Sequence, residues 1–455
     1  MTAAHTQHDQ HEHDLSHLLR SPGFQDWRRA VTALHGCSAP IHLTGSSRIY
    51  DRTTGTVLAE RDGDVLAPCG NRRASVCPAC SDRYASDAYH LLRSGMAGGK
   101  GVPESAAEHP RVFATLTAPS FGPVHTRRVT TRGLVVPCPC GEKHHRDDPR
   151  VGTALDGDSY DYVGAILWQA HAGQLWNRFA IRLRRTLAHQ LGIRVRDFPN
   201  RARLSYAKVA EYQRRGLVHF HAVVRLDGPD GPTDPPPRGI TTGTLHAAIT
   251  DAARSVSVVV DRPDGAPMAL AWGTQVDTRP ITSTAAAALE NDDGQISDSA
   301  LAAYVAKYAT KGTGKSEATD RPIRDITHLD HLNLTPHHRR LIETAWELGG
   351  REDYEDLNLR RWAHMLGFRG HFLTKSRAWS TTFGAIRSER RLYRLGELLA
   401  ALDTPAEPGS VLVVNDWQVT QIGHRNDAER DIATGIAERH REQRRTRTTE
   451  TGRTS

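Results

Sequence analysis

AEYQRRGLVHFHAVVRL, at residues 210–226, is the most informative stretch of this sequence. Two runs rich in β-branched and apolar residues flank Arg-Arg-Gly at 214–216, which is the pattern of a β-hairpin with a three-residue loop. A glycine at position 216 suits the left-handed backbone conformation that such a loop favours. The sequence therefore predicts two antiparallel strands, over residues 204–213 and 218–226.

This hairpin predicts a metal site. Alternate side chains of a strand share a face, so His219 and His221 point the same way. A three-residue loop places Glu211 opposite His219, where it becomes the third ligand of a divalent cation. Gln213 lies on the same face and remains a rival to Glu211, and another loop length would put Tyr212 there instead. The alternative is an ordinary hairpin with hydrogen-bonded histidines, because His-x-His occurs often by chance.

A second motif is AAYVAKYATKG at residues 302–312, within a run that predicts a helix from 298 to a glycine at 312. Tyr304 and Tyr308 are neighbours on one helical face, and Lys307 and Lys311 each follow a tyrosine by three residues. A nearby ammonium group favours the phenolate over the phenol and can hold phosphate oxygens. The alternative is an amphipathic helix with half-buried tyrosines and solvated lysines. Three of the seven lysines in the chain fall at 307, 311 and 315, which favours a functional cluster.

The remaining patterns indicate an α+β protein. VFATLT, at 112–117, alternates as a strand does, and residues 162–190 have the periodicity of a long amphipathic helix. A helix is also expected around residues 426–445. We expect a chain of four parts: a disordered tail (1–30), a cysteine-rich module (31–105), a core of strands and helices that carries both motifs (106–315) and a basic C-terminal region with a flexible tail (316–455).

The cysteines form two groups. Six cysteines in a chain without a secretory signal are more often metal ligands or buried thiols than disulfides. Cys69, Cys77 and Cys80 lie in CGNRRASVCPAC and resemble a zinc knuckle or ribbon, with Cys37 as the fourth ligand.

Cys138 and Cys140 lie in CPCGEKHH. Together with His144 or His145 they form a second zinc site or contribute to the first. Buried thiols without a metal are the alternative for both groups.

The charge of the chain favours a polyanionic partner. Its formal net charge is +7, and only seven of the 59 basic residues are lysine. Arginine pairs with phosphate through two parallel hydrogen bonds, although a GC-rich genome also inflates arginine. No apolar run approaches the roughly 20 residues of a membrane span. We therefore expect a cytoplasmic protein with no membrane partner.

Basic and aromatic residues alternate between 357 and 388, as in proteins that hold single strands, where bases stack on rings beside cations. The alternative is that these rings belong to the hydrophobic core. The aromatic residues are Trp362, Phe368, Phe372, Trp379 and Phe383. The residues expected to contact DNA are Arg214, Arg215, Arg369, Lys375 and Arg377.

The strand VFATLTAPS, the HFH triplet and YVAKYATK follow one another in the order of the three motifs of rolling-circle replication initiators of the HUH endonuclease superfamily, and the chain resembles this family. The paired tyrosines resemble those of the initiators of small single-stranded-DNA phages. Further segments resemble the RepSA-like initiators of actinomycete plasmids and integrative elements, and the likeness spans roughly residues 36–390. These segments are GCSAPIHLTG, CGNRRASVCPACSDRY, TLTAPSFGPVH, CPCGEKHHRDDPRVG, AEYQRRGLVHFHAVVRLDG and GHFLTKSRAWSTTFGAIR.

The resemblance implies that residues 106–315 form an HUH nuclease core that nicks and rejoins one DNA strand, and that this core is an antiparallel sheet flanked by helices. It implies that His219 and His221 bind Mg²⁺ or Mn²⁺, that Tyr304 and Tyr308 are nucleophiles that form a 5′-phosphotyrosine, and that Lys307 and Lys311 assist them. Single- and double-stranded origin DNA would be the substrate, and a host helicase and polymerase would be partners. No nucleotide cofactor is expected, because no GxxxxGK[ST] loop is present.

Three other functions remain open. A two-tyrosine HUH transposase shares the same chemistry and can carry cysteine clusters. A conjugative relaxase fits less well, because the tyrosines come late in the chain. A zinc-bearing DNA-binding regulator that only retains the fold would be expected to have lost a histidine or a tyrosine, and all four are present.

Overall fold

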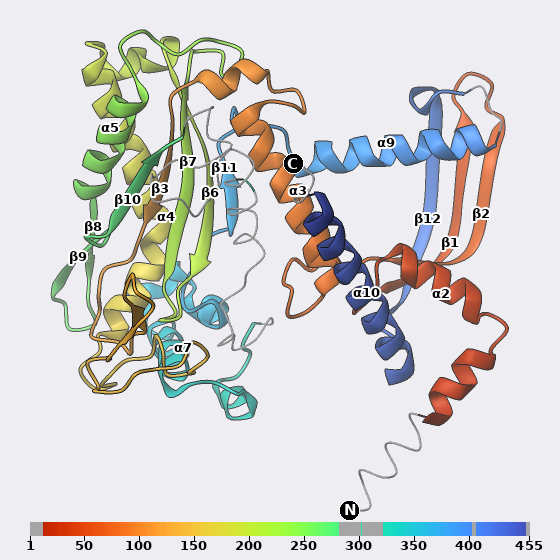
Figure 1. Ribbon diagram of the computed structural model, residues 1–455, viewed down its shortest axis with the longest axis horizontal. Coiled ribbons are helices and arrows are strands. Elements are labelled where there is room, and N and C mark those ends of the chain that lie inside the picture. The colour runs from red at the N-terminus through yellow and green to blue at the C-terminus, as the bar shows by residue number, and fades with distance from the viewer. Residues whose placement is uncertain (1–11, 282–301, 303–321, 403–405, 452–455) are drawn as a thin grey trace, which may run out of the picture. The chain divides into compact units, whose positions relative to one another are not determined.

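The computed structural model describes residues 12–281, 302, 322–402 and 406–451 (Figure 1). The chain divides into two compact units. One unit is Ala88–Thr381, and the other combines Met1–Asp87 with Thr382–Ser455. In sequence, the first unit is thus an insertion between the two parts of the second.

The Ala88–Thr381 unit is built on a five-stranded antiparallel sheet with the strand order β10-β3-β7-β6-β11. The predicted hairpin supplies two of its inner strands, and the strand predicted at 112–117 pairs with the hairpin. The strands are β3 (Arg111–Leu116), β6 (Arg203–Tyr212), β7 (Val218–Asp227), β10 (Val276–Pro280) and β11 (Leu373–Lys375).

The register of the hairpin is the predicted one. Glu211 lies opposite His219, and Val209 lies opposite His221. The Gln213 N–H donates to the Leu217 carbonyl over 2.9 Å, which closes a three-residue loop at 214–216. Gly216 has φ +76°, and a Cβ there would come within 2.6 Å of a Leu341 methyl group. Glycine is therefore required both for the backbone conformation and for space.

Two polar side chains, one buried and one half-buried, hold this loop in place. The Gln169 side chain donates to the Gly216 carbonyl over 3.0 Å and accepts from the Val218 N–H over 2.9 Å, and it is fully buried. The Arg215 guanidinium donates to the carbonyl groups of Ala118 and Pro119, over 2.7 Å each. The hairpin loop is thus connected to a helix and to the segment that follows β3.

Helix α4 (Tyr162–Gln190), predicted at 162–190, covers the face of the sheet opposite the histidines. Trp176 of α4 packs on Phe220 of β7, with ring centroids 6.0 Å apart. The predicted apolar face of the helix is buried: Leu175, Phe179, Leu183 and Leu187. The other helices of this unit are α5 (Thr242–Arg254), α7 (Pro336–Leu348) and α8 (Leu359–Trp362), and its small hairpins pair β4 (Arg128–Val129) with β5 (Val135–Val136) and β8 (Ser257–Asp261) with β9 (Pro267–Ala271).

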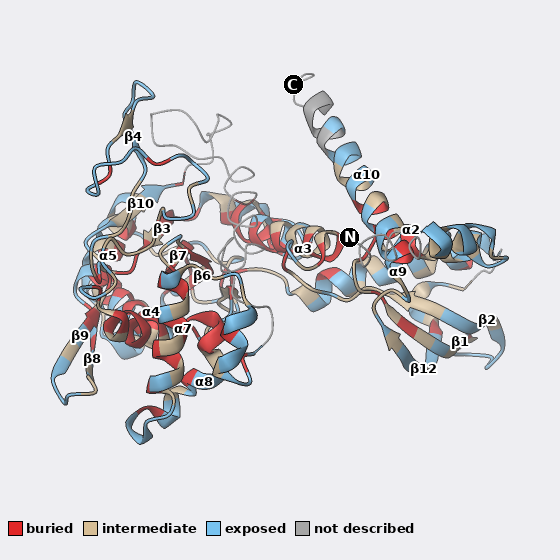
Figure 2. Ribbon diagram, turned by 90° about the horizontal axis from the view of Figure 1, so that it is seen from below, coloured by how far each residue is buried: buried red, intermediate tan, exposed pale blue. Residues whose placement is uncertain are grey.

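The other unit contains a three-stranded antiparallel sheet with the order β12-β1-β2. Its strands carry mostly exposed and half-buried residues, in contrast to the buried inner strands of the larger sheet (Figure 2). The strands are β1 (Ile41–Asp51), β2 (Val57–Ala67) and β12 (Val411–Ile422), and the helices are α2 (Phe24–Ala33), α9 (Phe383–Ala401), α10 (Asp427–Thr451) and the first half of α3 (Pro78–Ala97).

This grouping differs from the linear division expected from the sequence. Residues 12–20 are helical and α2 begins at Phe24, so the described part of the stretch expected as a tail contains helices. Val31 of α2 is buried against Ala433 and Ile436 of α10. The region after 315 is shared between the units, because β12 pairs with β1 whereas residues 322–381 join the larger core.

No helix among these described residues combines the length and the apolar character needed to cross a bilayer.

The contacts of Gln169 generate a test of stability. Gln169→Met keeps the size of the side chain but leaves the Gly216 carbonyl and the Val218 N–H without their partner. We expect the free energy of unfolding to fall by about 2–4 kcal/mol, because two buried backbone groups lose their hydrogen bonds. Urea unfolding followed by circular dichroism measures the change. Gln174→Met, at an exposed position of the same helix, is the matched control, and equal effects of the two substitutions would contradict the role of Gln169.

Candidate functional site

The structure brings Glu211, His219 and His221 together on one face of β6 and β7. One carboxylate oxygen of Glu211 lies 2.9 Å from Nε2 of His219 and 3.2 Å from Nε2 of His221. The His219 side chain is 16% exposed and that of His221 4%. The three groups are close enough to share one cation. Two imidazoles and a carboxylate leave further coordination positions free for a substrate oxygen, which suits a divalent ion that acts on a phosphate.

Strand β3 orients the His221 ring. The Thr115 hydroxyl lies 3.1 Å from Nδ1 of His221, and the Phe113 ring stacks on the imidazole with centroids 5.7 Å apart and planes 10° apart. A hydrogen bond at Nδ1 leaves Nε2 as the nitrogen that faces Glu211, which is how metal-binding histidines are commonly fixed. Sequence analysis placed this strand but assigned no role to Thr115. The alternation in VFATLT could have indicated this role, because it puts Phe113 and Thr115 on the same face of the strand.

The two rivals of Glu211 are turned elsewhere. The Gln213 side-chain oxygen accepts from the Arg215 guanidinium over 2.8 Å. Tyr212 lies on the opposite face of β6, where its hydroxyl donates to the Met365 carbonyl. Of these three residues, Glu211 is therefore the one within reach of both histidines.

Tyr304, Lys307, Tyr308 and Lys311 lie outside the described residues.

Cys37, Cys69, Cys77 and Cys80 form a compact cluster, as the sequence predicts. Neighbouring sulfurs are 3.6–3.7 Å apart, and all four cysteines are free thiols. A tetrahedral zinc ion with Zn–S bonds of about 2.3 Å places its sulfurs about 3.8 Å apart, so the cluster has the size of a zinc site.

Polar neighbours of these cysteines favour bound thiolates. The Ser38 N–H donates to the Cys77 sulfur over 3.3 Å, and the Cys69 N–H donates to the Cys37 sulfur over 3.4 Å. Hydrogen bonds from the Cys37 and Cys80 thiols hold the pKa of Cys77 well below its usual range. The thiolate is thus favoured at Cys77, whereas the pKa of Cys37 and that of Cys80 are raised within the same cluster.

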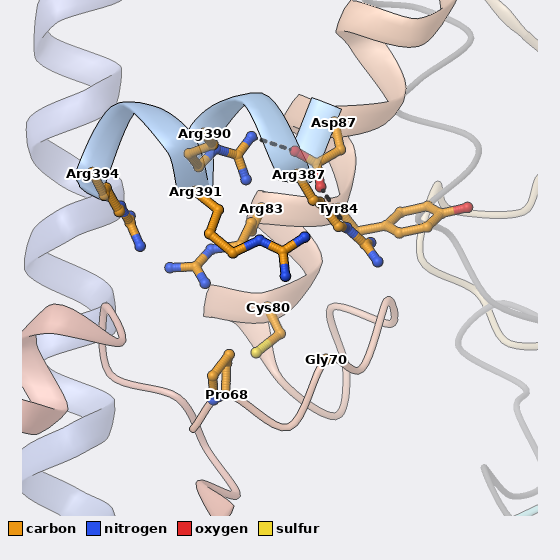
Figure 3. A pocket seen from close by; sticks show the side chains of 10 residues that line it. All are labelled: Pro68, Gly70, Cys80, Arg83, Tyr84, Asp87, Arg387, Arg390, Arg391 and Arg394. Carbon is orange, nitrogen blue, oxygen red and sulfur yellow. Dashed lines mark hydrogen bonds and ion pairs between the residues drawn. The ribbon is translucent and has the colours of Figure 1, made fainter. Parts of the chain in front are cut away.

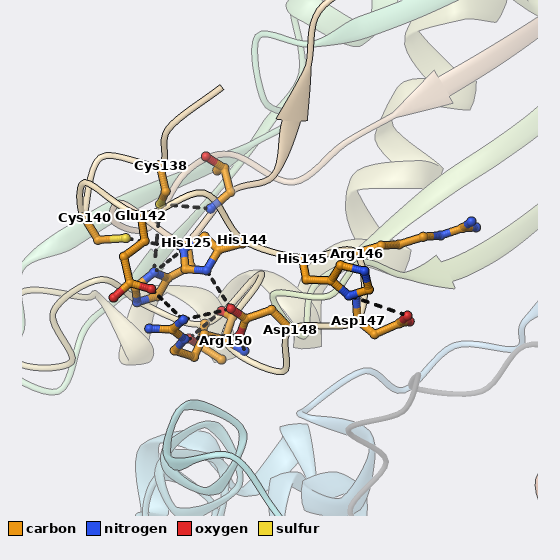
Figure 4. A network of polar contacts seen from close by, with 12 residues as sticks. His125, Cys138, Cys140, Glu142, His144, His145, Arg146, Asp147, Asp148 and Arg150 are labelled. Atoms are coloured by element: carbon orange, nitrogen blue, oxygen red, sulfur yellow. Dashed lines mark hydrogen bonds and ion pairs between the residues drawn. The ribbon is translucent and has the colours of Figure 1, made fainter. Parts of the chain in front are cut away.

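A second cluster contains His125, Cys138, Cys140 and His144 (Figure 4). Nε2 of His144 lies 3.1 Å from Nδ1 of His125 and 3.3 Å from the Cys140 sulfur. Its Nδ1 lies 2.8 Å from Asp148, which is the arrangement of a carboxylate behind a metal-bound histidine. This cluster is separate from the four-cysteine group.

The fourth member of the second cluster is His125, which sequence analysis missed. His125 lies 13 residues before Cys138, and no short spacing pattern links the two. The other histidine that was considered, His145, is exposed and faces Asp147 instead.

Burial raises the pKa of Cys138, but hydrogen bonds from the Cys140 and Thr126 N–H groups outweigh it and bring the pKa to about 6.

The expected single-strand-binding stretch is largely internal. Phe368, Phe372 and Trp379 are buried, so these three rings cannot stack on bases. They are part of the packing, because residues 357–381 fold against the sheet and its helices. Basic and aromatic residues that alternate along a sequence do not reveal which of the rings face solvent.

Four of the five basic residues expected to contact DNA already bond to carbonyl groups of the protein. Arg214 donates to Arg146 and Arg369 to Asp356, over 2.8 Å in both cases. Lys375 donates to the Ser380 carbonyl over 2.9 Å, and its burial lowers its pKa. Arg215 is held by the two carbonyl groups described above, whereas Arg377 is exposed.

Comparisons with known proteins agree with one another. The family model described as "Replication initiator protein, pSAM2" (RepSA) matches residues 23–438. A "Replication initiator protein" of Streptomyces ambofaciens is 45% identical over 423 residues, which cover 90% of this chain and 89% of that protein. No solved structure matches. The length of both matches shows that this chain belongs to the RepSA family of replication initiator proteins.

Proposed function

We propose that this replication initiator starts rolling-circle replication by cutting and rejoining one DNA strand as an HUH endonuclease. The observation that carries the proposal is the cluster of Glu211, His219 and His221 on the inner strands of an antiparallel sheet. Paired strands are rigid, and catalytic groups held on rigid elements keep their geometry. The carboxylate suits Mg²⁺ or Mn²⁺, and the two imidazoles favour a transition metal, so Mn²⁺ fits this mixed ligand set better than Mg²⁺.

His219, His221 and Glu211 would hold the metal ion. A bound ion would polarise the scissile phosphate and stabilise the charge that develops on its oxygens. The Thr115 hydroxyl lies against Nδ1 of His221 and fixes that imidazole, which leaves its Nε2 to bind the ion. Phe113, packed flat against His221, keeps water from that side of the ring.

Tyr304 or Tyr308 supplies the nucleophile in this proposal. Its phenolic oxygen forms a bond to phosphorus, and the bond from phosphorus to the 3′ oxygen breaks. The products are a free 3′-hydroxyl and a 5′-phosphotyrosine on the protein. The phosphodiester energy is retained, so rejoining needs no nucleotide cofactor. After one round of replication, the second tyrosine cuts the regenerated site. The ammonium groups of Lys307 and Lys311 favour the phenolate form of both tyrosines.

The substrate is origin DNA, both as a duplex and as a single strand, and the protein would act in the cytoplasm. A polymerase extends the 3′-hydroxyl and a helicase separates the strands, because nicking alone copies nothing. A two-tyrosine transposase would use the same steps, but the replication initiator family argues for replication.

Replacement of both tyrosines tests the covalent step. A single-stranded origin oligonucleotide and Mn²⁺ should give a protein–DNA adduct that survives SDS. Tyr304→Phe/Tyr308→Phe should lower adduct formation by a factor on the order of a thousand or more, because the nucleophile is lost. Tyr393→Phe, at an exposed tyrosine, is the control. Failure of the unaltered protein to form an adduct, with salt-sensitive binding retained, would indicate a DNA-binding regulator.

His219→Ala tests the metal site. We expect a loss of nicking of about a hundredfold or more, because one metal ligand is removed. Binding to duplex DNA, measured by fluorescence anisotropy, should change little. His371→Ala, at an exposed histidine, is the control. Equal loss of nicking and binding would mean that His219 is structural.

The two other clusters are proposed to hold structural zinc. Each has four ligand groups from Cys or His within 4.8 Å of one another, which matches a closed tetrahedral site.

Metal analysis separates the two clusters. The purified protein should contain about two zinc ions per chain, one for each closed site. Cys77→Ser and Cys140→Ser should each retain about one, since the sites are independent. Plasma mass spectrometry of the dialysed proteins measures the zinc content. Loss of both ions in either variant, or none lost in one, would contradict two separate sites.

A further inference from the structure

An arginine-lined cleft lies in the unit formed by the two ends of the chain (Figure 3). It has a volume of about 550 Å³ and lies beside the four-cysteine cluster, because Cys80 belongs to both. Five arginines line it: Arg83 from α3, and Arg387, Arg390, Arg391 and Arg394 from α9.

The four arginines of α9 share one face of the helix. Arg390, Arg391 and Arg394 follow Arg387 by three, four and seven residues, which places the four side chains in a row along the helix. The row is about 10 Å long at 1.5 Å per residue. Such a row on a convex surface would be an ordinary solvated face. Here it forms one wall of a cleft, and Pro68, Gly70 and Cys80 form the opposite wall.

Asp87 is the one carboxylate among the described residues that line the cleft. Its side chain is 1% exposed and accepts from Arg387 over 3.2 Å and from Arg390 over 2.5 Å. Asp87 therefore fixes two guanidinium groups at the inner end. Five cations around one carboxylate repel one another, so the cleft is strongly positive and favours an anion.

The form of the cleft suits a chain of phosphates. Guanidinium groups bind phosphate through paired hydrogen bonds, and a row of about 10 Å is long enough for more than one phosphate of a DNA strand. Tyr84 is the aromatic residue among the described residues that line it, and its ring stacks on Phe383 with centroids 5.2 Å apart. That ring points away from Arg391 and Arg394 in Figure 3. The cleft thus offers charge without the free rings that single-strand binders use to stack bases.

We infer that this cleft binds the phosphodiester backbone of duplex DNA and is the site that holds the double-stranded origin. The inference rests on the proposed function, to which it adds a binding site away from the metal-binding hairpin. The four-cysteine cluster shapes one wall of the cleft, so its folding and duplex binding are linked.

A triple variant tests the cleft. Arg83→Gln/Arg391→Gln/Arg394→Gln removes three charges and leaves the pairs of Asp87 with Arg387 and Arg390 intact. Affinity for an origin duplex, measured by fluorescence anisotropy without Mn²⁺, should fall on the order of tenfold or more at 0.1 M salt. A plot of log K against log salt concentration should become less steep, its slope decreasing in magnitude by up to about three. Each lost phosphate contact removes nearly one released counterion.

The matched control is Arg28→Gln/Arg52→Gln/Arg61→Gln, which removes the same charge from exposed positions of the same unit. It should bind the duplex like the unaltered protein. Circular dichroism and zinc content check folding, and Arg394→Gln alone should lower the slope by about one if the triple variant is unstable. Equal effects of the two triple variants would overturn the inference.

Two further measurements, one of single-strand binding and one of competition by phosphate, identify the ligand. The triple variant should lose less affinity for a single strand of the same length than for the duplex. An equal or greater loss of affinity for the single strand would reject the preference for duplex DNA. Inorganic phosphate at the same total phosphate concentration should displace the duplex poorly, and efficient displacement would indicate a site for free phosphate. Binding is measured without nicking. Absence of an adduct in the unaltered protein would therefore reject the proposed endonuclease and leave the test of the cleft intact.

Discussion

The three-residue loop between β6 and β7 fixes which side chains share a face of the central sheet. Side chains alternate along a strand, so a shift of one residue would move His219 and His221 away from Glu211. The left-handed Gly216, the double hydrogen bond of Gln169 and the anchoring of Arg215 all act on this loop. A buried glutamine on a core helix thereby holds in register two strands whose opposite face carries the candidate catalytic metal ligands.

The two units contribute different physical properties. The larger unit has a deep core, and its sheet holds three ligand groups within 4.8 Å of one another. The smaller unit has a thin sheet with small clusters of buried residues. A small core supplies little stabilisation, so a four-cysteine site is a fitting substitute. Five arginines line a cleft in this unit, and charge acts over a longer range than direct contacts do.

Local patterns made much of this predictable. The hairpin and its register followed from alternation and from one glycine, and the four-cysteine cluster followed from a CxxC spacing with nearby cysteines. Nonlocal features did not follow. The pairing of Ile41 with Ile422 joins positions 381 residues apart, and no periodicity reports such a partner. His125 had no spacing signal. Buried rings such as Trp379 could not be distinguished from base-stacking rings, because both alternate with basic residues.

The pairing of β1 with β12 has a consequence for synthesis. Domains generally fold as units during translation, and the inserted residues 88–381 are complete before β12 leaves the ribosome. At that stage β1 and β2 lack their third strand, and α9, which carries four of the five arginines of the cleft, has not been synthesised. A chain cut short before residue 382 would retain the histidine hairpin but not the four arginines of α9 that line the cleft. The proposed strand cutting and the proposed duplex binding would therefore become possible at different times during synthesis.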